Sequence, residues 1–372
     1  MKELDEKRSM INSLDSELAV LFEKRMNLVR EIGMLKGDTG TAVYNPEREL
    51  AVIDNILGSI KDNGLYPYAS EFARDMMEVS KKYQKDLIKS RTKVRHLKLE
   101  EGGEAGYQGA EGSYTEQAFA WIYGEGTKAR AYGRLADLFE AISCGELSAG
   151  VVPFENSSTG GVNAVTDMMR DYDLYIKAET ELRIEHCLLG QKGSMLRDIK
   201  YVYSHPQALG QCAGFFSENP GLTECSYQNT AFAARDVAAW GKIENGAIAS
   251  KRCARLYGLD IVREGIQDNT KNKTRFIVIS ADPTPEDDAS KTSILFTSNH
   301  TPGALYKMLE PFYENSINIT RIESRPNPRR SFEYYFYLDF NGSAYDQNIV
   351  KALEKAKESC GYFRILGSYR II

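Results

Sequence analysis

The 372-residue sequence lacks the patterns that mark several common protein classes. No apolar run approaches the roughly 18 residues of a membrane span. The net charge is only −5, with 47 Lys and Arg against 52 Asp and Glu, so no overall positive charge favours nucleic acid or an anionic membrane. The first ten residues, MKELDEKRSM, are charged rather than apolar. We therefore expect a cytoplasmic protein with no nucleic-acid or membrane partner.

Metal and nucleotide motifs are also missing. The six cysteines are scattered without a C-x-x-C pair, and the four histidines are dispersed as well. This distribution argues against a disulfide framework or a zinc site. Neither G-x-G-x-x-G nor G-x-x-x-x-G-K-[ST] occurs, so the sequence does not suggest NAD- or ATP-dependent chemistry.

Two stretches have the composition of linkers. Residues 91–104 lose apolar periodicity and contain Gly102-Gly103, and residues 281–290, ADPTPEDDAS, carry two prolines and four acids. The length is compatible with two to three domains. We expect three, covering residues 1–90, 105–280 and 291–372.

The first domain is predicted to be all helical. Apolar residues recur every seven positions in two series, with Arg25 as the single charged member: Leu4, Ile11, Leu18, Arg25, Ile32 and Leu14, Leu21, Leu28, Leu35. This heptad predicts a helix from about residue 3 to residue 36, roughly 50 Å long, whose apolar seam needs a partner helix. Asn45-Pro46 is typical of the start of a second helix. A third is expected after Pro67, with one apolar stripe: Phe72, Met76, Val79, Tyr83 and Leu87.

Arg25 is costly on an apolar seam unless another group meets its charge. One interpretation is a register-setting residue paired with an acid of a partner helix. The other is an anion site, because Arg8 and Lys36 extend a cationic row along the same helix. Arg8 and Lys36 are roughly 42 Å apart on a straight helix, so they converge only if two copies run antiparallel. Ser80 and Gln84, four residues apart, would add neutral hydrogen-bonding groups from one helix face.

This pattern resembles the all-α chorismate mutase domain, with Asn45 where an Asp is common. The matching residues are Arg8, Arg25, Lys36, Arg48, Glu49, Ser80 and Gln84. The resemblance implies that chorismate rearranges to prephenate, with the arginines clamping carboxylates, Lys36 and Gln84 at the ether oxygen, and Glu49 on the ring hydroxyl. It also implies that the first arginine comes from the other subunit of a dimer. A pericyclic reaction needs positioning and charge stabilisation rather than a nucleophile, a base or a metal.

The middle domain alternates short β-like runs with helical stretches, an α/β pattern. Four polar motifs stand out in it: Gly109 to Tyr114, Pro153 to Gly161, Tyr203 to Gln207 with Gln211, and Asp268 to Phe276. Polar residues that follow strands in α/β proteins lie where ligands bind, and the amides of helix N-termini favour anions.

Together these motifs resemble the prephenate dehydratase domain, which implies two α/β lobes around a cleft, as in periplasmic binding proteins. The implied lining is Ser113, Asn156, Ser204, Gln207, Gln211, Thr274 and Arg275. In the implied reaction prephenate loses CO2 and its ring hydroxyl to give phenylpyruvate, and no cofactor is required. Thr274 would act at the leaving hydroxyl, with water or Glu155 assisting, and Arg275 would bind a carboxylate.

The last domain has the β-α-β-β-α-β order of ferredoxin-like α+β folds. Pro302-Gly303-Ala304-Leu305 opens its first helix, and Glu323-Ser324-Arg325-Pro326 follows a predicted strand. These motifs resemble the ACT regulatory domain, which implies phenylalanine as the effector.

The three blocks in this order resemble the bifunctional chorismate mutase–prephenate dehydratases of phenylalanine biosynthesis. This resemblance implies feedback inhibition by phenylalanine and a homodimer or larger homo-oligomer. Two alternatives are an arogenate dehydratase and a catalytically inactive amino-acid sensor. The fused mutase disfavours the first, and the charged set of the first domain together with Thr274-Arg275-Phe276 disfavours the second.

Overall fold

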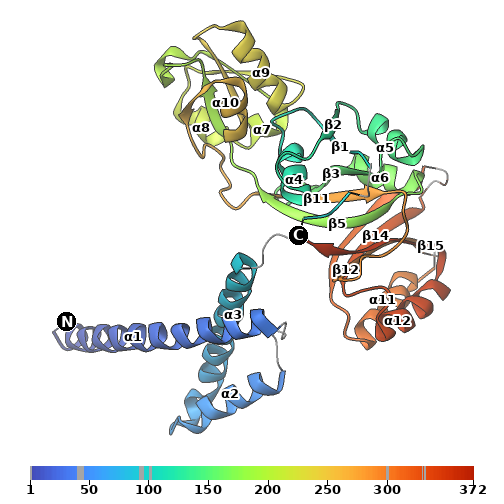
Figure 1. Ribbon diagram of the computed structural model, residues 1–372. Helices are drawn as coiled ribbons and strands as arrows, with labels where there is room; N and C mark the ends of the chain where they lie inside the picture. The colour runs from blue at the N-terminus through green and yellow to red at the C-terminus, as the bar shows by residue number, and fades with distance from the viewer. Residues whose placement is uncertain are drawn as a thin grey trace. The chain divides into compact units, whose positions relative to one another are not determined.

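The computed structural model describes residues 2–39, 46–91, 96–99, 103–298, 301–328, 330 and 332–372. The chain divides into two compact units, Met1–Arg95 and His96–Ile372 (Figure 1). Within the described ranges, no helix is long and apolar enough to cross a membrane.

The first unit is helical, as predicted. It contains α1 (Lys2–Thr39), α2 (Pro46–Gly58), a short 3-10 turn η1 (Asn63–Leu65) and α3 (Tyr66–Arg91). The N-terminal part of α1 extends beyond the other two helices (Figure 1). Leu14 and Leu21 of the heptad are 57% and 60% exposed, so the described residues of the first unit leave this part of the seam uncovered. Asn45, the expected cap of the second helix, lies outside the described residues.

The helix α3 packs against α1 along a face different from the predicted stripe. Ala73, Met77, Ser80 and Gln84 are buried, whereas Phe72 and Val79 are mostly exposed. Gly33 permits the close approach of the two helices, because an added Cβ there would lie 3.1 Å from Gln84 Cγ. The helix also begins at Tyr66, so Pro67 lies in its first turn, where the missing N–H is harmless.

The second unit starts with a two-lobed α/β region, which confirms the predicted arrangement (Figure 1). The first lobe contains β1 (Ala105–Gln108), β2 (Ala129–Tyr132), β3 (Ala149–Asn156), β4 (Gly160–Gly161), β5 (Tyr175–Arg183), β11 (Lys273–Ser280), α4 (Tyr114–Tyr123), α5 (Leu135–Ser143) and α6 (Asn163–Asp171). The second lobe contains β6 (Cys187–Gly190), β7 (Tyr201–Ser204), β8 (Thr223–Ser226), β9 (Asn245–Ala249), β10 (Asp260–Arg263), η2 (Leu196–Asp198), α7 (Pro206–Gly210), α8 (Ala213–Glu218), α9 (Thr230–Trp240) and α10 (Lys251–Tyr257). Two segments, 184–186 and 264–272, connect the lobes.

The C-terminal part has the predicted β-α-β-β-α-β order. Its elements are β12 (Lys291–Ser298), α11 (Ala304–Glu314), β13 (Ile319–Pro326), β14 (Tyr334–Asn341), α12 (Gln347–Glu358) and β15 (Cys360–Ile371). The strand order β13-β14-β12-β15 is the ferredoxin-like one. The end of β15 then pairs in parallel with β5, so these strands and those of the first lobe form one ten-stranded sheet.

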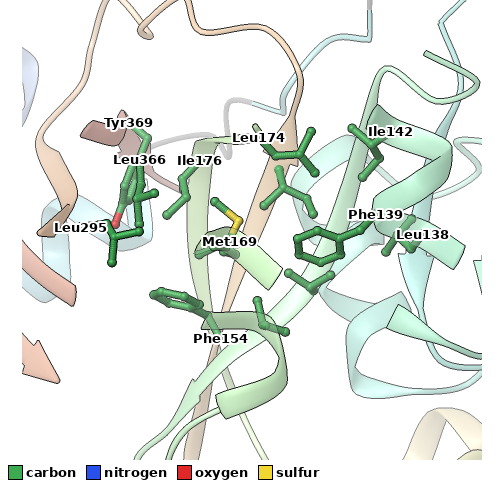
Figure 2. Close-up of a cluster of buried hydrophobic side chains, with 14 of the residues drawn as sticks. Leu138, Phe139, Ile142, Phe154, Met169, Leu174, Ile176, Leu295, Leu366 and Tyr369 are labelled. Atoms are coloured by element: carbon green, nitrogen blue, oxygen red, sulfur yellow. The ribbon is translucent and has the colours of Figure 1, made fainter. Parts of the chain in front are cut away.

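The predicted linker 281–290 is therefore not a break in the fold. Lys177 Nζ lies 2.7 Å from Asp282 Oδ2, which ties the segment to β5. An apolar core also crosses this boundary (Figure 2). Phe139 and Ile176 of the first lobe belong to the same buried cluster as Leu295 and Tyr369 of the C-terminal strands.

Candidate active sites

The first unit contains a cavity of about 400 Å³ between its three helices. Six of the seven predicted mutase residues line it: Arg25 and Lys36 from α1, Arg48 and Glu49 from α2, and Ser80 and Gln84 from α3. Val29, Ile32, Val52 and Met77 supply an apolar wall. With Lys81, the cavity thus combines four cations with hydrogen-bonding groups and apolar surface, which suits a small anion with a carbon ring.

Arg25 has a partner within its own chain. Its Nη1 donates a hydrogen bond of 2.5 Å to Ser80 Oγ, and Ser80 donates in turn to the carbonyl of Met76 at 2.7 Å. Burial lowers the pKa of Arg25, but a guanidinium remains charged at neutral pH. Since its described partner is a neutral hydroxyl, the charge of Arg25 is available to an anion in the cavity.

Lys81 is a cavity residue that the sequence did not reveal. Its Nζ lies 2.5 Å from Glu78 Oε1 and 2.9 Å from Glu49 Oε1, and these carboxylates raise its pKa. A lysine on a helix surface is common, so nothing in the sequence distinguished it. Its contact with Glu49 means that this carboxylate is held in place by a cation within the cavity.

Arg8, the seventh predicted mutase residue, does not join the cavity. Its side chain is 67% exposed and pairs with Asp5 on the same helix at 3.5 Å. Arg8 lies 17 residues before Arg25, which is roughly 26 Å along α1. Its contribution from a second subunit stays a prediction.

A second cavity, of about 440 Å³, lies between the two α/β lobes. Five of the eight predicted dehydratase residues line it: Ser113, Asn156 and Thr274 from the first lobe, and Gln207 and Gln211 from the second. The lobes touch across it, because Gln207 Nε2 donates to Thr159 Oγ1 at 3.0 Å. Among the described residues that line this cavity there is no Lys, Arg, Asp or Glu.

Asn156 positions Thr274 inside this cavity. The two residues pair directly in the register of β3 and β11, and Asn156 Nδ2 donates to Thr274 Oγ1 at 2.9 Å. The same amide also contacts Asn272 Oδ1 at 2.8 Å, and its oxygen accepts from the Ser158 N–H. Since Thr274 Oγ1 accepts from Asn156, its hydroxyl proton can be donated to a ligand.

Three predicted dehydratase residues lie elsewhere. Ser204 is fully buried, and its hydroxyl donates to the carbonyl of Ile248 at 2.7 Å. Arg275 and Glu155 point to the opposite face of the sheet from Thr274 and Asn156, because successive residues of a strand alternate between faces. The sequence motif contained the right strand, but Arg275 and Glu155 do not line the cavity.

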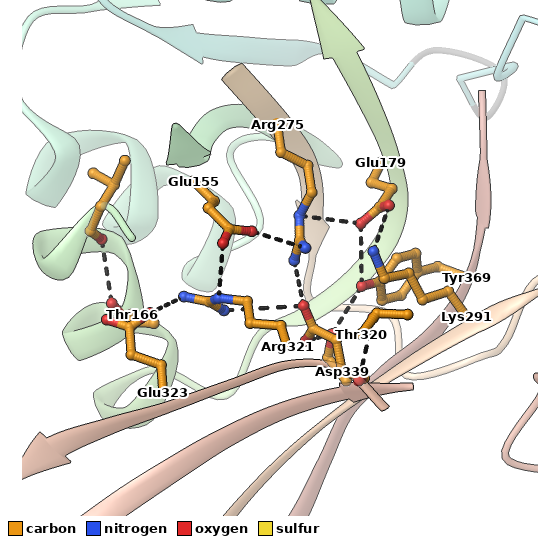
Figure 3. Close-up of polar contacts among 12 residues, drawn as sticks. Glu155, Thr166, Glu179, Arg275, Lys291, Thr320, Arg321, Glu323, Asp339 and Tyr369 are labelled. Atoms are coloured by element: carbon orange, nitrogen blue, oxygen red, sulfur yellow. Dashed lines mark hydrogen bonds and ion pairs between the residues drawn. The ribbon is translucent and has the colours of Figure 1, made fainter. Parts of the chain in front are cut away.

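Arg275 belongs instead to a buried ion-pair network between the first lobe and the C-terminal strands (Figure 3). Its guanidinium contacts Glu155 at 3.0 Å, Glu179 at 3.3 Å, and Asp339 of β14. Burial alone would lower the pKa of Arg275, but the carboxylates of Asp339 and Glu179 raise it. Arg321 of β13 lies 3.8 Å from Glu155 and 4.0 Å from Asp339 (Figure 3). The strand that carries Thr274 is thereby joined to the C-terminal part.

The two motifs predicted to bind phenylalanine occupy different elements. Gly303, with φ 77°, caps α11 ahead of Ala304 and Leu305. Glu323, Ser324, Arg325 and Pro326 lie within β13 rather than after a strand. Arg325 Nη2 lies 2.7 Å from Asp167 of α6, and a side chain at Gly161 would collide with Glu323. Glu323 and Arg325 therefore contact the first lobe near the interlobe cavity.

Positive potential reaches the interlobe cavity from backbone groups. Ser113, Tyr114 and Thr115 at the start of α4 line it, as do Asn229 and Thr230 at the start of α9. Helix N-termini carry partial positive charge and bind anions. His186 and His205 also line the cavity, and burial lowers the pKa of each imidazole.

The described residues thus form two separate polar cavities, a cationic one in a helical unit and a neutral one between two α/β lobes. The sequence matches the Chorismate mutase type II family over residues 7–85 and the Prephenate dehydratase family over residues 105–284. A bifunctional chorismate mutase/prephenate dehydratase from Aquifex aeolicus is 33% identical over 372 residues, which is 99% of this chain and 98% of that protein.

Two further comparisons concern the second unit. An arogenate dehydratase/prephenate dehydratase from Arabidopsis thaliana is 39% identical and covers 71% of each chain. The structure of a prephenate dehydratase from Arthrobacter aurescens in complex with L-Phe matches with a TM-score of 0.67 at 30% identity, covering 72% of this chain and 89% of that one. The chain belongs to the family of bifunctional chorismate mutase/prephenate dehydratases, and it carries both activities in phenylalanine biosynthesis.

Proposed function

We propose that the helical cavity is the chorismate mutase site and that the interlobe cavity is the prephenate dehydratase site. The observation that supports the second assignment most directly is the Asn156–Thr274 pair, which leaves a hydroxyl proton free in a cavity whose described lining includes no acidic side chain. The product of the first site is then the substrate of the second.

At the mutase site, Arg25 and Arg48 hold the two carboxylates of chorismate and bring the ends of the breaking and forming bonds together. Lys36 and Gln84 donate to the ether oxygen, where negative charge develops as the C–O bond breaks. Glu49, held by Lys81 at 2.9 Å, accepts from the ring hydroxyl. Arg8 of a second subunit completes the site, so the active form is a homodimer or a larger homo-oligomer.

At the dehydratase site, prephenate loses CO2 and water in a balanced step. The electron pair of the bond to the ring carboxylate moves into the ring, and the ring expels its hydroxyl group. Thr274 donates a hydrogen bond to that leaving group, which takes up one proton from solvent water and departs as water. The N-termini of α4 and α9 bind carboxylates. Because Glu155 faces the other side of the sheet, we assign it no part in the proton transfer.

We further propose that the C-terminal part is an ACT domain that binds phenylalanine through Gly303 to Leu305 and Glu323 to Pro326. The dehydratase from Arthrobacter aurescens was crystallised with L-Phe, which supports phenylalanine as the effector. The ion pairs of Arg275 give effector binding a direct route to the strand of Thr274. The cytoplasm is the location that we propose for this enzyme.

A two-step assay tests this function. Purified protein is given chorismate, and the loss of chorismate and the appearance of phenylpyruvate are followed separately. Loss of chorismate without phenylpyruvate would remove the dehydratase assignment. A second assay compares arogenate with prephenate as the substrate of the dehydratase. It tests the alternative of an arogenate dehydratase, which the name of the Arabidopsis relative supports. If kcat/KM is higher for arogenate than for prephenate, arogenate is the substrate of the second site.

A further inference from the structure

We propose that His186 supplies the positive charge that the dehydratase cavity lacks: the substrate binds together with a proton, and His186 holds that proton as an imidazolium facing a substrate carboxylate. This inference rests on the proposed dehydratase site. The cavity lacks a cationic side chain for its substrate, because prephenate is a dianion and none of the described cavity-lining side chains is Lys or Arg.

His186 is held firmly between the lobes. It lies in the connection between β5 and β6, and its side chain lines the cavity although the residue is only 3% exposed. Its backbone N–H donates to Gln267 Oε1 at 2.9 Å, and its carbonyl accepts from the Ile266 N–H at 3.1 Å. Both contacts come from the second connection between the lobes, so they hold the backbone of His186, while Gln211 and Tyr114 contact its ring.

Both ring nitrogens of His186 face acceptors. Nε2 lies 3.0 Å from Gln211 Oε1, and Nδ1 lies 3.3 Å from Tyr114 Oη. The Tyr114 hydroxyl already donates its only proton to the carbonyl of Glu185 at 2.6 Å, so its oxygen is an acceptor toward Nδ1. An imidazolium satisfies both contacts, because it alone carries an N–H on each nitrogen.

Of the two histidines that line the cavity, His186 is the one whose ring contacts Tyr114 and Gln211. Burial raises the pKa of Tyr114 well above its ordinary value, and it raises the pKa of the neighbouring thiols Cys187, Cys212 and Cys253 as well. The Glu185 carboxylate pairs with Lys251 at 3.1 Å, which also contacts Glu264. His205 is the other histidine of the cavity, and it accepts from the Gln207 N–H through Nδ1.

The sign of the pH effect follows from these environments. In the empty cavity burial lowers the pKa of His186, so the ring is mostly neutral at pH 7. A bound dianion raises that pKa. Substrate affinity is therefore constant below the free-state pKa, falls by up to about tenfold per pH unit above it, and levels off above the bound-state pKa.

Steady-state dehydratase kinetics between pH 6 and 9 test the inference. For wild type, KM for prephenate should rise with pH. His186→Gln should raise KM about tenfold or more at pH 6.5 and flatten the profile, whereas His205→Gln should keep the wild-type slope. Mutase activity of each sample reports its integrity. A persistent slope in H186Q, or its loss in H205Q, would overturn the inference.

Histidine NMR provides the direct readout, since the chain has only four histidines and H186Q identifies the relevant signal. Saturating phenylpyruvate should raise the pKa of His186, and Tyr114→Phe should lower it by removing an acceptor. An unchanged pKa refutes proton uptake. If T274V and H186Q both left dehydratase activity unaltered, the proposed site itself would fail. If only T274V impaired it, this inference alone would fail.

Discussion

Replacing Thr274 by valine removes one hydroxyl from the dehydratase cavity with almost no change in volume. The residue is 9% exposed and pairs with Asn156 across β3 and β11. The variant therefore isolates the hydroxyl from the shape of the site. Thr274→Ser is the matched control, because it keeps the hydroxyl and loses a methyl group.

The structural cost should be small. Asn156 Nδ2 loses its 2.9 Å contact with Thr274 Oγ1 but keeps Asn272 Oδ1 at 2.8 Å and the Lys273 carbonyl at 3.2 Å. One lost hydrogen bond costs about 0.5–1.5 kcal/mol of folding free energy. The loss of a group that assists proton transfer typically costs about 10²- to 10⁴-fold in rate. A hundredfold loss corresponds to about 2.7 kcal/mol in the barrier.

Phenylpyruvate formation from supplied prephenate measures the effect, with mutase turnover as the internal control. We expect T274V to lose at least about 10²-fold in kcat, with unchanged mutase activity and a melting temperature near that of wild type. T274S should retain much more activity than T274V. If T274V works within about threefold of wild type, Thr274 is not the group at the leaving hydroxyl.

Three further predictions concern the mutase site and the effector site. Arg25→Ala should lower mutase kcat/KM by about 10²- to 10⁴-fold through lost charge-assisted hydrogen bonds and leave dehydratase activity unchanged. Replacement of the exposed Arg30 by alanine should change neither activity, and near-normal chorismate turnover in R25A would make Arg25 structural. Residues 1–90 alone should sediment as a dimer with mutase activity, because the heptad seam of α1 is exposed in one chain, and a fully active monomer would refute the shared site. Gly303→Val should weaken phenylalanine binding and inhibition by blocking close approach, whereas Gly193→Val, with nearly the same φ and equally open surroundings, should not; equal sensitivity of both variants would move the effector elsewhere.

Six of the seven predicted mutase residues line one cavity, which the sequence could anticipate because helical geometry is regular. Ser80 and Gln84 share a face by their spacing, and the long helix fixes the positions of Arg25 and Lys36. The predicted apolar stripe of α3 is not its buried face. The helix instead buries the face that carries Ser80 and Gln84, and it leaves Phe72 exposed. Apolar periodicity alone does not identify a buried helix face that carries polar residues.

In the dehydratase region, motifs located the correct strands, but the direction of single side chains was harder to predict. Thr274 and Arg275 are adjacent in one motif and point to opposite faces, so one reaches the cavity and the other the ion-pair network. A single histidine in a connection between two lobes forms no recognisable motif, so nothing in the sequence was a reason to select His186. The prolines and acidic residues of 281–290 predicted a linker between separate domains. Local sequence could not reveal that β15 pairs with β5 and joins the parts on either side of this segment in one sheet.

The pairing of β15 with β5 also has a consequence for how the polypeptide folds during synthesis. Thr180 of β5 donates to the carbonyl of Ile372 at 3.0 Å, a contact across 192 residues of sequence. At translation rates of about 5–20 residues per second, the interval between these residues is roughly 10 to 40 s. Until β15 emerges, this edge of β5 remains open, and an open strand edge invites pairing with other chains. Newly made chains should therefore be most prone to aggregate after the first lobe has formed and before the last strand arrives.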